Sequence, residues 1–203
     1  MPTLPLGPLV TRFLDERGAT RTGPRGDAKS TTATLAAYER ASWESVLEFE
    51  EDYGGLELCD PGSTTPALVV GPFACLSPGD YRLSEPRLIP VMFSADDVVY
   101  SLDEEGRGWT MAAMVEGKHR LSARNGRQLL TQAILWRALA SDLSGAQLEQ
   151  GMCGAKWAAK AELKPIHEAS SDSERWWGDG ERLVVELLSG NGYEGPTTVG
   201  RLG

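Results

Sequence analysis

The sequence predicts an α+β protein in which an antiparallel β-sheet is flanked by helices and followed by a C-terminal extension of helix and strands. Three observations predict this class. An amphipathic helix ends at a glycine pair, short β-type runs follow it at close spacing, and a second helix comes after the runs. Connections this short leave no room for crossover helices, so neighbouring strands should pair antiparallel.

The chain opens with a short helix and a linker. Leu9 and Phe13 recur at helical spacing and predict a helix over Pro8–Arg17. The segment Gly18–Ser30 contains three glycines, a proline and charges of both signs, which is typical of a mobile linker. Residues 1–30 are therefore expected to precede the main domain.

The principal helix is predicted over Thr32–Tyr53. Its apolar residues follow helical spacing and form one stripe, made of Leu35, Tyr38, Val46, Phe49 and Tyr53. Its carboxylates lie mostly off that stripe, at Glu39, Glu44, Glu48, Glu50, Glu51 and Asp52. Glycine accepts the left-handed conformation that closes a helix, so Gly54-Gly55 should end it.

After Gly54-Gly55, the spacing of the apolar residues changes from the helical period to short runs typical of strands. The β-type runs are Leu56–Leu58, Leu68–Val70, Leu88–Phe93, Val98–Leu102 and Trp109–Val115. Asp103–Gly108 lies between the last two runs and is predicted to be a hairpin connection. A second helix is predicted over Arg127–Ser141, with Asn125 as its cap. Residues 31–141 are thus expected to form one α+β domain.

Residues 142–203 are expected to form an extension packed on the same domain. The pattern predicts a helix over Gln147–Glu162, a polar irregular segment over Ile166–Gly180, a strand over Leu183–Leu188 and a terminal strand over Thr197–Leu202.

The irregular segment holds the pair Trp176-Trp177. Neighbouring side chains diverge in any regular element, so one core does not easily bury both. Two interpretations stay open: Trp177 is exposed at a contact while Trp176 anchors the segment, or both pack in a bent segment that covers the sheet.

Composition narrows the classes of partner. The chain has 203 residues, and its 29 acidic and 20 basic side chains leave a net charge of −9. This balance argues against nucleic acid as the main partner and leaves open a basic protein, toward which a negative surface steers association. Solubility alone also explains such a charge.

The cysteines and the length of the apolar runs indicate where in the cell the protein is expected. The three cysteines form no CxxC pair, which argues against a secreted disulfide framework. Met1–Val10 carries three prolines and a glycine, which disfavour the helical core of a signal peptide. The apolar runs are far shorter than the roughly 20 residues that span a bilayer. We expect a cytoplasmic protein without membrane association.

No motif indicates catalysis or a bound cofactor. Cys153 and His167 could be imagined as a nucleophile and its base, but no local signature supports the pair. Histidines and cysteines do not approach zinc spacing, and Asp96-Asp97 lacks the pattern of a calcium loop. The glycine-rich segments match no phosphate-binding motif. We therefore expect neither an enzyme nor a metal or cofactor site.

Four local features together resemble the SUKH superfamily. Trp43–Leu56 is similar to the family's opening helix, glycine pair and first strand, and Leu88-Ile89-Pro90-Val91 is similar to its strand with an isoleucine-proline step. Val98–Asp103 is similar to the next strand, and Arg127–Leu139 stands where the family places its last helix. The resemblance covers Thr31–Ala140, about half of the chain, and rests on the order of these features.

The resemblance implies a function. Most of the family is similar to immunity proteins, which bind a cognate bacterial toxin and neutralise it by occluding its active site; a basic toxin would fit the acidity of this chain. A minority of the family resembles regulatory or scaffold proteins, and an enzyme with an unrecognised site is a further alternative. The oligomeric state stays open.

Candidate contacts follow from expected exposure and charge. Carboxylates at strand ends and turns can pair with lysines and arginines of a toxin, and they are equally typical of turns that keep a protein soluble. The candidates are Asp96, Asp97, Asp103, Glu104, Glu105 and Trp177.

Overall fold

The computed structural model describes residues 6–16, 20–21, 36, 43–60, 63–71, 88–95, 98–112, 119–141, 154–179, 181–188 and 194–201. The chain divides into two compact units, Met1–Arg127 and Gln128–Gly203. The helices and strands of both units establish an α+β fold, as the sequence predicts. The domain boundaries after residues 30 and 141 stay a prediction.

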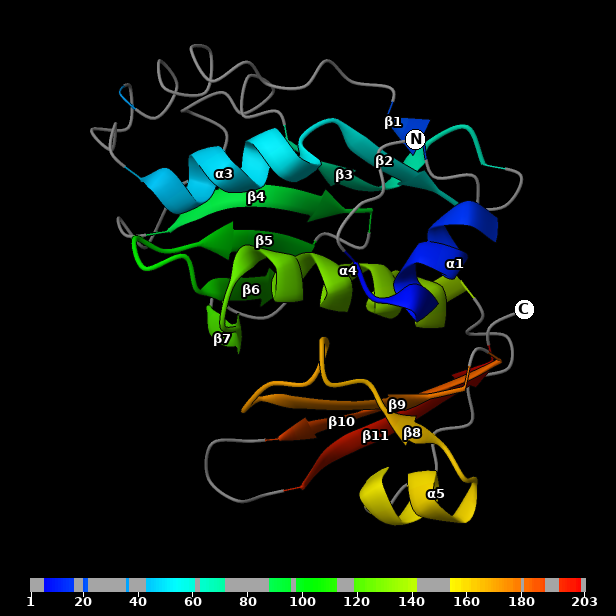
Figure 1. Ribbon diagram of the computed structural model, residues 1–203. Helices are drawn as coiled ribbons and strands as arrows, with labels where there is room; N and C mark the ends of the chain where they lie inside the picture. The colour runs from blue at the N-terminus through cyan, green and yellow to red at the C-terminus, as the bar shows by residue number, and fades with distance from the viewer. Residues whose placement is uncertain are drawn as a thin grey trace. The chain divides into compact units, whose positions relative to one another are not determined.

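The first unit is built on a seven-stranded antiparallel sheet whose strands follow chain order, so that each pairs with the next (Figure 1). The strands are β1 (Thr20–Arg21), β2 (Leu56–Cys59), β3 (Pro66–Val70), β4 (Ile89–Ser94), β5 (Val98–Leu102), β6 (Gly108–Ala112) and β7 (Arg120–Ala123). Antiparallel pairing of the predicted runs is confirmed. β1 lies within the segment predicted to be a linker, and β7 follows the last of the predicted runs.

Two helices with complete bounds belong to this unit, α1 (Pro8–Glu16) and α3 (Glu44–Tyr53). α3 lies across one face of the sheet (Figure 1) and buries Val46, Phe49 and Tyr53, three members of the predicted stripe. The continuous helix expected from Thr32 is wrong, because Trp43 adopts φ −82 and ψ 85 and α3 begins only after it.

A second expectation that the structure contradicts concerns the exposure of Glu50, near the end of α3. Glu50 was expected off the apolar stripe, yet it is 1% exposed. Its carboxylate lies against Gly54 and Gly71, and a methyl group at either position would collide with it. Gly71 also has φ +44, where other residues are strained. The two missing side chains leave the space that the carboxylate fills.

The second unit contains a four-stranded sheet in the order β11-β10-β9-β8. Its elements are α4 (Gly126–Ser141), which starts in the first unit, α5 (Gly154–Lys160), β8 (Lys164–Pro165), β9 (Glu174–Gly178), β10 (Arg182–Leu188) and β11 (Glu194–Arg201). The predicted helix at 127–141 and the two C-terminal strands are confirmed. The irregular segment expected over Ile166–Gly180 is wrong, because it contains β9.

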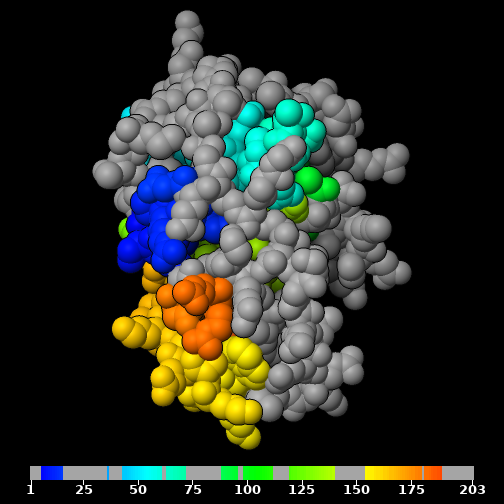
Figure 2. Space-filling model, turned by 90° about the vertical axis from the view of Figure 1, so that its right-hand side faces the viewer, coloured from blue at the N-terminus to red at the C-terminus, as the bar shows by residue number. Residues whose placement is uncertain are grey.

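Helices lie on both faces of this sheet. Trp136 of α4 meets Trp176 edge-on at a centroid distance of 5.3 Å, and Gln132 donates to the backbone oxygen of Ala169. On the other face, Ala158 of α5 packs with Leu163 and Val184, and Trp177 covers this cluster. α5 lies at the surface shown in Figure 2, where it is yellow. Within the described residues, no helix is long and apolar enough to cross a membrane.

Candidate functional site

The structure separates the six sequence-predicted contact residues. Glu104 and Glu105 are exposed at the tip of the β5–β6 hairpin, as expected. Asp103 is only 4% exposed, so its expected exposure is wrong. Trp177 is half-buried in the second unit. Asp96 and Asp97 lie outside the described residues.

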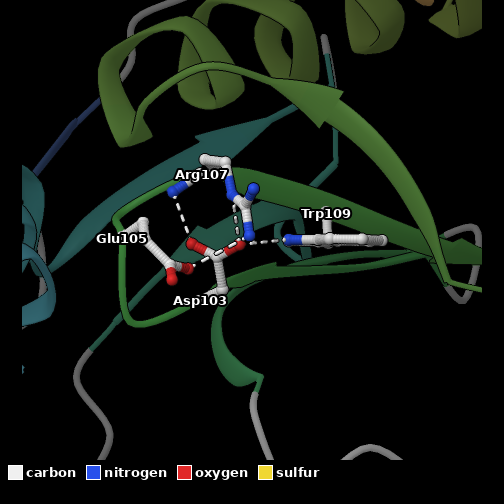
Figure 3. A network of polar contacts seen from close by, with 4 residues as sticks. All are labelled: Asp103, Glu105, Arg107 and Trp109. Carbon is white, nitrogen blue, oxygen red and sulfur yellow. Dashed lines mark hydrogen bonds and ion pairs between the residues drawn. The ribbon is translucent and has the colours of Figure 1, made fainter.

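Asp103 is buried because three donors converge on its carboxylate (Figure 3). The backbone N–H of Arg107 donates to Oδ1 at 2.8 Å, and Arg107 Nε donates to Oδ2 at 2.7 Å. Trp109 Nε1 donates to Oδ2 at 2.9 Å. The hydrogen bond to Asp103 and the charge of Asp103 raise the pKa of the Arg107 guanidinium above its ordinary value. Asp103 therefore fixes the hairpin from within.

The backbone of the same turn is closed by two further bonds. The N–H of Gly106 donates to the carbonyl of Asp103 at 2.9 Å, and the N–H of Asp103 donates to the carbonyl of Arg107 at 3.1 Å. Gly106 has φ +76, which only glycine adopts without strain. Because of this geometry, Glu104 and Glu105 project from a turn of defined shape.

The hairpin tip contacts the first turn of α3. A Cβ atom placed on Gly106 would lie 2.9 Å from Cβ of Ser45. The N-terminus of α3 and the β5–β6 turn accordingly lie at the same end of the sheet in Figure 1. This contact places the first turn of α3, which begins with Glu44, beside the hairpin tip, which carries Glu104 and Glu105.

We call the resulting region the acidic surface. Its members are all exposed and come from α3 and the hairpin: Glu44, Glu48, Glu51, Asp52, Glu104 and Glu105. Arg107, 47% exposed, offsets part of this charge through its contact with Glu105 at 3.1 Å. The surface still carries a clear excess of negative charge, which attracts cationic groups over about a Debye length.

The sequence indicated both halves of this surface but not their contact. The carboxylates of α3 recur at helical spacing, and those of the hairpin follow a predicted strand. The contact of Gly106 with Ser45 is tertiary and leaves no local pattern. The burial of Asp103 did have a local signal, since an aspartate that opens a turn often accepts hydrogen bonds from residues further along it.

The two adjacent tryptophans both pack within the second unit. Trp176 is fully buried, and its Nε1 donates to Oε2 of Glu174 at 3.0 Å. Trp177 lies on the opposite face of β9 and packs against the cluster beneath α5. The interpretation in which both residues pack is therefore favoured, although they do so in a strand.

Further titratable groups lie outside the acidic surface. His167 is exposed, and its imagined partner Cys153 lies outside the described residues. Glu186 is buried and accepts the N–H of Gly154 at 2.8 Å, which fixes the start of α5 on β10. Within the described ranges, no three histidine, cysteine, aspartate or glutamate side chains gather as a metal-ion site.

Comparison of the chain with family models, curated proteins and solved structures finds no match.

Proposed function

We propose that this chain is a non-enzymatic immunity protein that binds a basic bacterial toxin in the cytoplasm through its acidic surface and occludes the toxin's active site. The proposal rests on the SUKH-like order of sequence features and on one structural observation. That observation is the contact of Gly106 with Ser45, which places the acidic first turn of α3 beside the acidic tip of the β5–β6 hairpin.

The construction of the surface supports recognition of a macromolecule. α3 buries its apolar side on the sheet, and Asp103 holds the hairpin through three hydrogen bonds. Little ordering is then needed on binding, so less free energy is lost on association. Clustered exposed carboxylates accelerate the encounter with a cationic partner and align it.

The surface also assigns different roles to the sequence-predicted residues. Glu104 and Glu105 are proposed to contact the toxin together with Glu44 and Glu48, whereas Asp103 supports the hairpin from inside. Asp96, Asp97 and Trp177 stay candidates from the sequence alone. Charge substitutions that test the interface should therefore leave Asp103 in place, since its loss would disturb the fold.

The test measures association of the full chain with the toxin encoded by a neighbouring gene. The variant Glu104→Lys/Glu105→Lys should slow association about tenfold at low salt, and the difference should shrink as salt screens the charges. The matched control is Asp172→Lys/Glu181→Lys, which makes the same change of charge at exposed positions of the second unit. Stopped-flow fluorescence gives the rates.

Three outcomes would contradict the proposal. Equal slowing by the control variant would mean that overall charge acts rather than this surface. A neighbouring toxin that does not bind the wild-type chain would remove the function. Turnover of a small compound by the purified chain, with a biosynthetic gene cluster around its gene, would favour an enzyme instead.

A further inference from the structure

Arg107 places a cation at the hairpin end of the acidic surface. Its side chain is 47% exposed, and Glu104 and Glu105 are exposed at the tip of the same β5–β6 hairpin. If the acidic surface attracted its partner by overall charge alone, this arginine would weaken the attraction. The Arg107 side chain must then serve either the hairpin or the partner directly.

The hairpin uses only part of the Arg107 guanidinium. Nε donates to Oδ2 of Asp103 at 2.7 Å, and Nη2 donates to Oε2 of Glu105 at 3.1 Å. Figure 3 shows the third nitrogen, Nη1, without a dashed line, and among the described residues it has no hydrogen-bond acceptor. A guanidinium has five N–H donors, so both donors of Nη1 and one of Nη2 stay available to a partner.

The hairpin does not depend on this side chain alone. The carboxylate of Asp103 also accepts the backbone N–H of Arg107 and Nε1 of Trp109, and both donors stay when the Arg107 side chain is replaced. The backbone bonds of the turn and the positive φ of Gly106 are likewise independent of it. Support of the hairpin therefore leaves the exposed donors of Arg107 without an explanation.

The contacts with Asp103 and Glu105 hold the guanidinium in place before a partner arrives. A long side chain loses rotamer freedom on binding, and one that its neighbours already hold loses less. The planar guanidinium matches the two oxygens of a carboxylate and forms two parallel hydrogen bonds with it. Arginine is also enriched among the residues that dominate the binding energy of protein interfaces. The group that fits Arg107 is therefore a carboxylate.

We propose that Arg107 is a specificity-determining contact that binds a carboxylate of the toxin, while the glutamates of the acidic surface bind the toxin's lysines and arginines. This inference rests on the proposed function and adds to it the chemistry of one toxin group, an aspartate or glutamate within an otherwise basic face. A basic protein without that carboxylate would place cations against Arg107, and like charges repel. The chain thereby distinguishes its cognate toxin from other basic proteins.

The test uses the full chain and the purified toxin encoded by a neighbouring gene, and it measures both rate constants by stopped-flow fluorescence. Arg107→Gln removes a positive charge from the acidic surface, so association should become about twofold faster. Dissociation should become about tenfold faster or more, because the toxin carboxylate loses its partner. Arg107→Lys keeps the charge but not the paired hydrogen bonds, so it should speed dissociation about threefold or more and leave association unchanged.

Two controls separate direct contact from charge and from folding. Arg182→Gln makes the same change of charge at an arginine of the second unit that is likewise paired with an aspartate, Asp179, and it should leave dissociation unchanged. A lysine oligomer with an amidated C-terminus offers cations and no carboxylate, so Arg107→Gln should bind it more tightly than the wild type does. That gain would also show that the acidic surface of the variant is intact.

Exchange of charges identifies the toxin group. Arg107→Glu should bind the toxin far more weakly than the wild type does, since two carboxylates then face one another. Toxin variants that each replace one exposed aspartate or glutamate with lysine are screened against it. One of them should restore binding to Arg107→Glu by about tenfold or more and bind the wild-type chain more weakly.

Several results would overturn the inference and leave the proposed function in place. Unchanged dissociation of Arg107→Gln would mean that Arg107 only offsets charge, and weaker binding of the lysine oligomer would mean that it only supports the hairpin. Faster dissociation of Arg182→Gln to the same extent, or no toxin variant that restores binding, would also overturn it. A toxin that does not bind the wild-type chain would remove both the inference and the proposed function.

Discussion

The carboxylate of Asp103 holds the β5–β6 hairpin together through hydrogen bonds. Its removal should therefore lower the free energy of unfolding more than removal of an exposed neighbouring carboxylate. Asp103→Ala leaves Trp109 Nε1 and the N–H of Arg107 without their acceptor. We expect a loss of about 1–3 kcal/mol in the free energy of unfolding. Urea denaturation followed by tryptophan fluorescence measures this loss. Glu104→Ala is the control and should change stability by no more than about 0.5 kcal/mol; equal losses would show that the network does not support the hairpin.

The environment of Asp179 predicts how the stability of the fold depends on pH. Burial raises the pKa of its carboxyl group, but hydrogen bonds from the Arg182 side chain and from the N–H groups of Glu181 and Arg182 outweigh burial and lower the pKa below its ordinary value. A depressed folded-state pKa contributes stability at pH values above the unfolded pKa, and this contribution is lost as the pH falls through the folded pKa.

The variant Asp179→Asn tests this contribution, because asparagine keeps an oxygen acceptor for the turn and loses the charge that pairs with Arg182. The pair is partly exposed, so the variant should be less stable at pH 7 by only about 0.5 kcal/mol. The difference should vanish as the pH drops below the folded-state pKa. Urea denaturation across a pH series measures it, and a difference independent of pH would contradict the assignment.

At the scale of elements, Glu174 connects α4 to β9. Its Oε2 accepts Trp136 Nε1 at 3.2 Å and Trp176 Nε1 at 3.0 Å. Glu174→Ala should therefore lower the free energy of unfolding by about 2–3 kcal/mol. Glu174→Gln keeps an acceptor and should lose less than half as much. Circular dichroism in urea gives both values, and equal losses would mean that the charge of the carboxylate matters rather than the presence of an oxygen acceptor.

The elements found from the sequence are those whose own residues carry the signal. The strands β2 to β6 are short β-type runs between turns, and α4 has a wide apolar face, so periodicity alone predicts them. β9 was missed because its polar positions hide the alternation: Glu174 is buried, and its carboxylate accepts the indole N–H groups of Trp136 and Trp176. Trp43 likewise lies within the range predicted to be helical, yet its backbone departs from the helix.

The sequence predicts the separate acidic segments of the acidic surface but not which of their carboxylates are exposed, because burial depends on tertiary contacts. Exposure of Glu104 and Glu105 follows from turn chemistry, whereas burial of Asp103 depends on Trp109 returning along the next strand. Glu50 has the spacing of an exposed residue, and Gly54 one turn later together with the distant Gly71 makes room for its carboxylate. Tertiary contacts of this kind decide which carboxylates a partner can reach.

At the scale of the whole molecule, the division into two compact units predicts that a destabilising substitution in one unit affects the stability of that unit alone. Gly71→Ala strains a backbone position with φ +44 and brings a methyl group onto the Glu50 carboxylate, so it should weaken the first unit. Gly71 donates to the carbonyl of Val91 and Gly55 to that of Val70, so amide exchange should speed up in β2–β4.

Hydrogen exchange followed by mass spectrometry distinguishes two ways in which the chain can open. If the units open independently, Gly71→Ala accelerates exchange in β2–β4 by about tenfold or more and leaves β9 and β10 unchanged. Glu174→Ala should then do the reverse, since its hydrogen bonds lie within the second unit. Acceleration of both units by either variant would instead show that they unfold together. Independent opening would allow the acidic surface to keep its shape while the second unit fluctuates, because α3 and the β5–β6 hairpin belong wholly to the first unit.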